Sequence, residues 1–207
     1  MIAVIDYGVG NLFSLVSSLR HIGQTVLVTG DPEELKKADR LILPGVGAFG
    51  DAAKKLRETG LGDALIEEAH RGKPVLGICL GMQLLMTKSF EFGEHEGLDL
   101  IPGEVRALSE VVDPALKIPH IGWNPLTLCR ETALFKYVRN GDSVYFVHSY
   151  HGTRCEKDTL ALTEYSAPVT AAIGRGNVAG CQFHPEKSGR VGLNILQAFA
   201  ETEGALC

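Results

Sequence analysis

The chain has 207 residues, of which 45% are hydrophobic and 22% charged, with a formal net charge of −5 and a pI near 5.8. This length supports one well-buried core and is short for two, so we expect a single domain over residues 1–207. The charges are spread without blocks of one sign, which excludes the basic surface that a nucleic-acid partner would require.

The amino-terminal segment and the cysteines indicate the compartment. Residues 1–6 carry no basic leader, and their apolar run is too short for a secretory core or a membrane span. The cysteines are odd in number and scattered, at positions 79, 129, 155, 181 and 207, which fits reduced thiols better than a disulfide framework. We therefore expect a cytoplasmic protein with no membrane contact.

The first third of the chain alternates short β-rich apolar runs with helical patterns. Strands are predicted at 2–5, 25–28, 41–43 and 75–78, and helices over 12–22 and, broken near Gly60 and Gly62, over 48–71. The first helix carries one apolar stripe and ends at Gly23. Strands that are apolar on both faces, such as 41–43 and 75–78, belong inside a parallel sheet covered by helices.

The remainder is predicted to contain more strands. A helix should continue from Gln83 to about Lys88, followed by short strands and loops up to Asn124. Strands are then predicted at 143–147, 160–163, 169–173 and 178–183, and a helix over 189–200. This order predicts an α/β fold with a mostly parallel central sheet, helices on both faces and a small antiparallel extension.

The segment Gly77–Gln83 contains the pattern G-x-C-x-G centred on Cys79. Glycines two residues before and two residues after the cysteine lack the β-carbons that would clash in a sharp turn from strand to helix, so the thiol can stand exposed at the carboxyl edge of the sheet. A cysteine that only packs in a core does not need these glycines. We therefore predict that Cys79 is a nucleophile.

The sequence His184-Pro185-Glu186 supplies a base and a carboxylate. The residue before a proline is pushed toward extended backbone, in which residues two apart project to the same side. Glu186 would then orient the imidazole of His184, giving a Cys79-His184-Glu186 triad. No second ligand cluster accompanies Cys181 and His184, so we expect no metal site.

Attack on a carbonyl makes an oxyanion, which needs N–H donors. The nucleophile turn supplies the backbone N–H of Leu80. The loop after the strand at 41–43 contains Gly45, Val46 and Gly47, and its glycines would allow the close approach that a second donor requires. An ordinary strand-to-helix turn explains these glycines equally well.

Together these segments resemble the class I glutamine amidotransferases and, within them, the glutaminase subunits of imidazole glycerol phosphate synthases. The similarity runs the whole chain, and its carriers are 6–11 (DYGVGN), 43–50 (LPGVGAFG), 77–83 (GICLGMQ), 119–124 (PHIGWN), 147–150 (VHSY) and 182–188 (QFHPEKS). The nucleophile turn and His-Pro-Glu mark the class. The loop at 43–50 and the segment 119–124 point to the subunit.

The resemblance implies a flavodoxin-like, doubly wound α/β domain without a cofactor, which hydrolyses L-glutamine through a thioester on Cys79. By the same resemblance Gln83 and Glu91 hold the amino-acid end of glutamine. Glu94 and Glu96 compete with Glu91 for this role. The segment His148-Ser149-Tyr150 would close over that end, largely through backbone groups.

The resemblance also implies a partner, a (β/α)₈-barrel cyclase that uses the ammonia to form imidazole glycerol phosphate in histidine biosynthesis. The residues implied to face this barrel are Asn11, Trp123, Tyr145 and Lys187. His151 departs from the family, whose members commonly carry an aromatic or basic residue there. We expect this substitution to touch the interface and not the triad.

Other functions remain open. A dinucleotide site after the first strand is excluded because the third glycine of G-x-G-x-x-G is replaced by Phe13. The chain could instead be a free-standing γ-glutamyl hydrolase or the glutaminase of another pathway, such as pyridoxal phosphate synthesis, although the segment 120–124 argues against both. It could also be an assembly subunit without catalytic activity, but the presence of all three triad residues argues against this interpretation.

Overall fold

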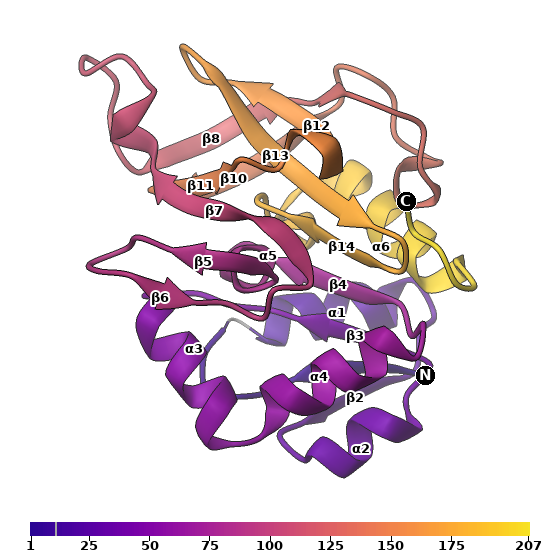
Figure 1. Cartoon of the computed structure of the whole chain (residues 1–207). Helices are drawn as coiled ribbons and strands as arrows, with labels where there is room; N and C mark the ends of the chain where they lie inside the picture. The colour runs from indigo at the N-terminus through magenta and orange to yellow at the C-terminus, as the bar shows by residue number, and fades with distance from the viewer. Residues whose placement is uncertain (11) are drawn as a thin grey trace.

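The computed structural model describes residues 1–10 and 12–207. Its largest feature is an eight-stranded sheet whose first five strands run parallel in the order β2-β1-β3-β4-β14 (Figure 1). Strands β13, β12 and β9 extend it antiparallel beyond β14. The eight strands are β1 (Ile2–Ile5), β2 (Val26–Thr29), β3 (Arg40–Leu43), β4 (Val75–Ile78), β9 (Thr127–Leu128), β12 (Thr159–Glu164), β13 (Pro168–Arg175) and β14 (Val178–Cys181).

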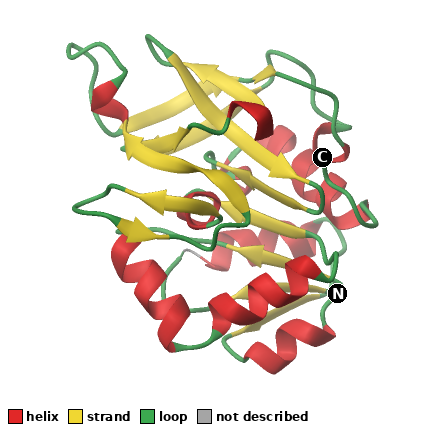
Figure 2. Cartoon of the chain, viewed as in Figure 1, coloured by secondary structure: helices red, strands yellow, loops and turns green. Residues whose placement is uncertain are grey.

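Helices cover both faces of this sheet (Figure 2). Leu19 of α1 and Phe199 of α6 are fully buried in one hydrophobic cluster. Leu35, Leu56 and Leu65, from α2, α3 and α4, are fully buried in a second cluster. The helices are α1 (Leu12–His21), α2 (Pro32–Lys37), α3 (Phe49–Glu58), α4 (Leu61–His70), α5 (Leu80–Leu84) and α6 (Gly189–Glu201). This arrangement is the predicted doubly wound fold, and the order of the parallel strands is the flavodoxin-like one.

The helix predicted to continue from Gln83 to about Lys88 is wrong, because α5 already ends at Leu84. The next residues form strand β5 (Met86–Ser89), whose Met86 pairs with Ile101 of strand β7 (Ile101–Ala107). Strand pairing with a segment distant in the sequence therefore overrides the local helical pattern.

The predicted break within 48–71 lies between α3 and α4, at Gly60, whose φ of 71° is in the left-handed region. This conformation suits glycine, so the break is confirmed there. Gly62 lies inside α4 and does not interrupt it.

Two smaller sheets complete the chain. One has four strands in the order β11-β7-β5-β6, and the other is the antiparallel pair β10-β8. Their strands are β5 (Met86–Ser89), β6 (His95–Glu96), β7 (Ile101–Ala107), β8 (His120–Pro125), β10 (Ser143–His148) and β11 (Tyr150–Thr153). Short 3₁₀ turns are η1 (Leu108–Glu110), η2 (Ala133–Phe135), η3 (Glu156–Asp158) and η4 (Pro185–Lys187).

The parallel pairing of β4 with β14 brings two distant parts of the sequence together. The backbone N–H of Cys79, the residue after β4, donates to the carbonyl of Cys181 at 2.8 Å. Ligands of open α/β sheets bind at the carboxyl ends of such strands. The residues that follow β4 and β14 therefore meet where a site is expected.

None of the described helices has the length and the hydrophobic run that a membrane-spanning helix needs. All five cysteines carry free thiols.

Candidate active site

Cys79 lies in a strained turn between β4 and α5. Its φ of 56° and ψ of −111° fall in a region that side-chain-bearing residues rarely adopt. A β-carbon on Gly81 would lie 1.8 Å from the carbonyl oxygen of Leu43, and one on Gly77 would lie 2.6 Å from that of Gly81. Both glycines of the G-x-C-x-G pattern are therefore required by backbone packing.

The imidazole of His184 lies beside Cys79 and contacts Glu186 on its other side. Its Nδ1 is 2.7 Å from Oε1 of Glu186, and both side chains are almost fully buried. Burial alone would lower the pKa of His184, but hydrogen bonds and charge interactions with Cys79 and Glu186 outweigh it and raise the pKa to about 9. The three groups thus form a connected set in which His184 readily holds a proton.

The contact between His184 and Glu186 matches the prediction, but its backbone differs from the expected one. His184 is extended, with φ −101° and ψ 99°, as the following proline requires. Glu186 instead lies in the 3₁₀ turn η4. This turn, rather than continuous extended chain, brings the carboxylate to Nδ1.

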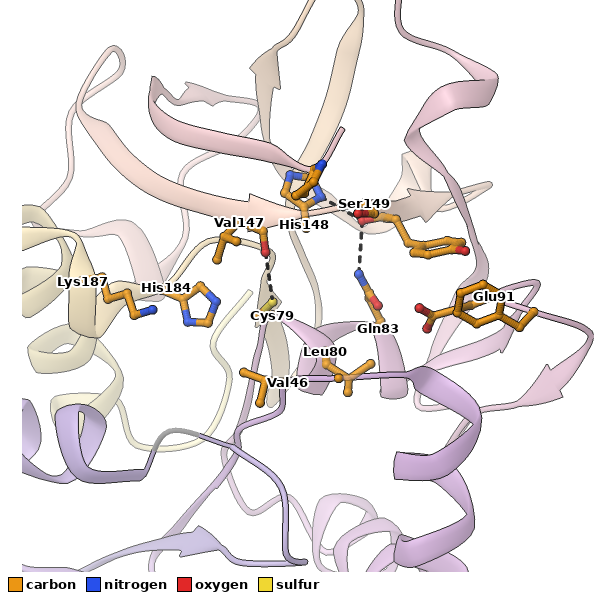
Figure 3. Close-up of a pocket in the computed structure, with 14 residues that line it drawn as sticks. Val46, Cys79, Leu80, Gln83, Glu91, Val147, His148, Ser149, His184 and Lys187 are labelled. Carbon is orange, nitrogen blue, oxygen red and sulfur yellow. Dashed lines mark hydrogen bonds between the residues drawn. The ribbon is translucent and has the colours of Figure 1, made fainter. Parts of the chain in front are cut away.

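A cavity of about 520 Å³ opens above Cys79 (Figure 3). Its volume is within the range of about 300–1,000 Å³ that is usual for small-molecule sites. It is lined by Val46, Gly47, Cys79, Leu80, Gln83, Glu91, Phe92, Pro119, Val147, His148, Ser149, Tyr150, His184 and Lys187. Eleven of these fourteen residues belong to the predicted site, which the fold therefore gathers from distant segments.

Three of the four residues predicted to form the oxyanion site, Val46, Gly47 and Leu80, line the cavity together with Cys79. Leu80 is the first residue of α5, so its N–H has no acceptor within the helix. Val46 and Gly47 line the cavity, and Gly47 has a φ of 97°. Gly45 does not line the cavity. It packs against Tyr7 and Leu80, and a β-carbon at this position would lie 2.7 Å from the hydroxyl oxygen of Tyr7 and 3.0 Å from the β-carbon of Leu80.

Glu91 and Gln83 lie at the end of the cavity away from His184 (Figure 3). Oε2 of Glu91 accepts the backbone N–H of Phe49 at 2.6 Å, at the start of α3. Burial raises the pKa of Glu91, although this hydrogen bond opposes the shift. Of the three competing acids, Glu94 and Glu96 do not line the cavity.

The segment from His148 to Tyr150 is anchored by buried hydrogen bonds. Nδ1 of His148 donates to the carbonyl of Tyr150 at 2.8 Å, and its Nε2 lies 3.1 Å from Nδ1 of His120. Burial lowers the pKa of His148 to about 3 and also lowers that of His120. Two neutral imidazoles thus hold this wall of the cavity in place.

Three cavity residues were not predicted: Phe92, Pro119 and Val147. Val147 contributes its carbonyl, which lies 4.0 Å from Sγ of Cys79. A fourth residue, Gln182, is not part of the cavity lining but contacts the sulfur, with its Nε2 3.7 Å from Sγ of Cys79. Its position directly before Phe183 and His184 in the sequence was the only available signal.

Two of the residues implied to face a partner, Trp123 and Tyr145, lie on the β10-β8 sheet, and Lys187 lies in the turn η4. Trp123 is 55% exposed, and its ring meets that of Tyr145 edge-on with centroids 6.0 Å apart. Nζ of Lys187 lies 5.8 Å from the centroid of the Tyr145 ring. Asn11 lies outside the described residues.

The expectation that His151 touches the interface is wrong for this chain. His151 lies on β11, paired with Arg106 of β7, and is 4% exposed. Neither ring nitrogen has a hydrogen-bond partner among the described residues. Its side chain therefore lies in the interior of the molecule and not at the surface.

Comparison with known proteins gives a consistent result. A family model described as "Glutamine amidotransferase class-I" matches residues 3–201. The chain is 50% identical over 202 residues to "Imidazole glycerol phosphate synthase subunit HisH" of Caldanaerobacter subterraneus subsp. tengcongensis, covering 97% of this chain and 98% of the relative. The protein of the same name from Moorella thermoacetica is also 50% identical, over 97% of this chain and 94% of the relative.

Solved structures agree in fold. A structure described as "Crystal structure of glutamine amidotransferase" superposes with a TM-score of 0.74 at 19% identity, over 96% of this chain and 98% of that one. "Structure of PurLQS from Thermotoga maritima" gives a TM-score of 0.73 at 22% identity, over 96% of both chains. At these identities the similarity concerns the fold alone.

Proposed function

Because this chain belongs to the class I glutamine amidotransferases, we propose that it hydrolyses L-glutamine to glutamate and ammonia. The ammonia would pass to a (β/α)₈-barrel cyclase that forms imidazole glycerol phosphate in histidine biosynthesis. The observation that carries the proposal is the strained Cys79, which shares one cavity with His184 while Glu186 contacts that imidazole from behind.

The first step is attack on the side-chain amide of glutamine. The Cys79 thiol gives its proton to Nε2 of His184, and the sulfur forms a bond to the amide carbon. The carbonyl oxygen takes the negative charge and is stabilised by the N–H of Leu80 together with a donor from the loop of Gly45, Val46 and Gly47. The raised pKa of His184, about 9, favours its acceptance of this proton.

Collapse of the tetrahedral intermediate releases ammonia. His184 returns the proton to the departing nitrogen, so the carbon–nitrogen bond breaks and a glutamyl thioester remains on Cys79. His184 then removes a proton from water, whose oxygen attacks the thioester carbon. Glutamate leaves and the thiol is restored, with Glu186 holding the imidazole in one tautomer throughout.

The opposite end of the cavity suits the charged amino-acid group of glutamine. We propose that Gln83 and the carboxylate of Glu91 bind the α-ammonium group, and that backbone groups of His148, Ser149 and Tyr150 bind the α-carboxylate. Glu91 lies in the cavity with one oxygen held by Phe49. This hydrogen bond supports the role, because it fixes the direction of the carboxylate.

Delivery of ammonia requires a partner. Free ammonia in neutral water is mostly ammonium, which is not a nucleophile, so the product must travel through a shielded passage. We propose that Trp123, Tyr145 and Lys187, with Asn11, face the cyclase. The exposed aromatic surface of the β10-β8 sheet beside Lys187 supports this placement.

The test is a glutaminase assay with and without the purified cyclase and its nucleotide ligand. We expect very low turnover alone and a rise of at least about 10²-fold in the complex, the usual effect of one oxyanion donor, because the loop at 44–47 must reorient a peptide before it donates. High activity without the partner would favour a free-standing hydrolase. No turnover under any condition, with partner binding intact, would favour an inert subunit.

Cys79→Ala provides the second test. Synthesis from glutamine should vanish, while the cyclase in the same complex should still work with added ammonium salts at raised pH. The measurement is product formation from each nitrogen source. Loss of both activities would mean that the substitution disrupts folding or assembly, and retained glutamine-dependent synthesis would contradict the role of the thiol.

A further inference from the structure

Gln182 lies directly after β14 and is completely buried. Its backbone N–H donates to the carbonyl of Ala171 in β13 at 2.9 Å, so the residue is fixed within the sheet. The parallel pairing of β4 with β14 places it beside Cys79, which follows β4.

The side chain of Gln182 contacts both the sulfur of Cys79 and the cavity residue Gln83. Its Nε2 lies 3.7 Å from Sγ of Cys79, within range for an N–H···S hydrogen bond. Its Oε1 accepts from Nε2 of Gln83 at 2.9 Å. Nε2 of Gln83 also donates to the backbone carbonyl of Tyr150 at 3.2 Å (Figure 3).

The carbonyl of Tyr150 determines which atom of Gln182 faces the sulfur. A carbonyl oxygen only accepts, so Gln83 must direct its NH₂ group toward Tyr150. The same NH₂ group then donates to Gln182, which must present its oxygen to Gln83 and its NH₂ group to Cys79. Rotating either amide would place two donors or two acceptors in contact inside a buried region.

We propose that Gln182 is a further catalytic residue, whose side-chain N–H donates a hydrogen bond to Sγ of Cys79 and stabilises the attacking thiolate. This inference rests on the proposed glutaminase function for the identity of the substrate. A thiolate accepts such a bond more strongly than a thiol, because hydrogen bonds to charged atoms are the stronger ones.

The step involves no covalent change at Gln182. The proton of the thiol moves to His184, and the electron pair left on sulfur receives the N–H of Gln182. Another polar neighbour of the sulfur, the carbonyl of Val147 at 4.0 Å, can accept only from the thiol form. Gln182 therefore compensates for the contact with Val147 that is lost when the sulfur ionises.

The experiment compares Gln182→Met with the unaltered chain and with Gln197→Met, a control on α6 outside the cavity. The rate of alkylation of Cys79 by iodoacetamide is followed against pH, using mass spectrometry to resolve Cys79 from the other cysteines. We expect the midpoint of this profile to move up by about one pH unit or more in Gln182→Met alone. In the complex, kcat/KM for glutamine should fall about 10- to 100-fold, mainly through kcat.

A purely structural role makes a different prediction. If Gln182 only supports Gln83, KM for glutamine rises and the alkylation profile stays unchanged, which overturns the proposal. Alkylation uses neither glutamine nor the partner. The chain could therefore lack glutaminase activity and still show the shifted pH profile of alkylation in Gln182→Met. That result would contradict the proposed function but would support the contact between Gln182 and Cys79.

Two further measurements test the proposal even if Gln182→Met does not fold. Gln182→Glu keeps the side-chain length and an oxygen toward Gln83 but removes the N–H donor once ionised, so its alkylation at alkaline pH should also be slowed. In the unaltered chain, the ¹⁵N–¹H resonances of the Gln182 carboxamide should shift as Cys79 ionises and should be insensitive to pH in Cys79→Ala. Unchanged resonances, or unslowed alkylation in Gln182→Glu, would overturn the proposal.

Discussion

At the scale of single residues, the site depends on how buried polar atoms are paired. His184 has Cys79 on one side and Glu186 on the other, and these two neighbours outweigh the effect of burial on its pKa. Oε2 of Glu186 is buried and accepts no hydrogen bond among the described residues. The carboxylate therefore has its main stabilising contact in the imidazole, and the two groups should be strongly coupled.

Glu186→Gln tests this coupling. The substitution removes a charge and a hydrogen-bond acceptor that both raise the pKa of His184, so burial should then lower that pKa from about 9. The fraction of His184 rings that carry a proton at neutral pH should therefore fall. NMR titration of the His184 ring measures the pKa, and kcat of the complex should fall by about 10²- to 10⁴-fold.

Glu164→Gln, at an exposed position on β12, is the matched control. It should leave both the titration and kcat unchanged. An unaltered titration of His184 in Glu186→Gln would contradict the coupling described above.

At the scale of elements, the turn from β4 to α5 explains the spacing of the sequence motif. β3, β4 and α5 pack so closely that no side chain fits at Gly81, where a β-carbon would overlap the carbonyl of Leu43. The turn also imposes a conformation on Cys79 that costs about 1–3 kcal/mol. Strand pairing on both sides of β4 holds this strain in place.

Gly81→Ala should therefore be severely destabilising. The β-carbon would meet backbone at 1.8 Å, and a backbone atom cannot rotate away as a side chain can. We expect a loss of more than about 3 kcal/mol in the free energy of unfolding, measured in urea, because the overlap exceeds ordinary overpacking.

Gly62→Ala is the control for this prediction. Its β-carbon would lie 3.3 Å from the flexible side chain of Leu98 and at the ordinary contact distance of 3.5 Å from the carbonyl oxygen of Leu56, and alanine favours the helix. Its unfolding free energy should stay within about 1 kcal/mol of that of the unaltered chain. Equal stabilities for the two variants would show that the packing at Gly81 relaxes.

At the scale of the whole molecule, the catalytic cavity and the aromatic surface lie close together. Lys187 lines the cavity and also contacts the ring of Tyr145, which meets Trp123 on the β10-β8 sheet. The last two residues of β10, Val147 and His148, line the cavity. A partner bound on this sheet would therefore act on residues directly connected to the reacting atoms.

Trp123→Ala should weaken association with the cyclase. A large, exposed aromatic residue at the centre of an interface commonly contributes about 2–4 kcal/mol, so the Kd should rise by roughly 30- to 1,000-fold. Isothermal titration calorimetry measures this change. Tyr137→Ala, at another exposed aromatic, 48% accessible and bonded to Glu201, should leave the Kd unchanged. An unchanged Kd for Trp123→Ala would place the interface elsewhere.

Much of this molecule follows from local sequence patterns. The alternation of apolar strands and striped helices predicted the parallel sheet and its two helical layers, because both periodicities act over a few residues. The glycines around Cys79 predicted its turn for the same reason, since the clash they avoid is local. The helix after Gln83 was predicted wrongly because its fate depends on pairing with β7, about fifteen residues further along the chain.

The amino-acid order alone determined which groups this protein carries for its chemistry: a thiol in a glycine-flanked turn, an imidazole before a proline, and a carboxylate two residues later. Only the tertiary structure decided how they are surrounded. The contact of Gln182 with the sulfur, the choice of Glu91 over its neighbours and the burial of His151 all arise from strands that pair across tens of residues. Such contacts depend on where distant segments meet, and no short stretch of sequence contains that information.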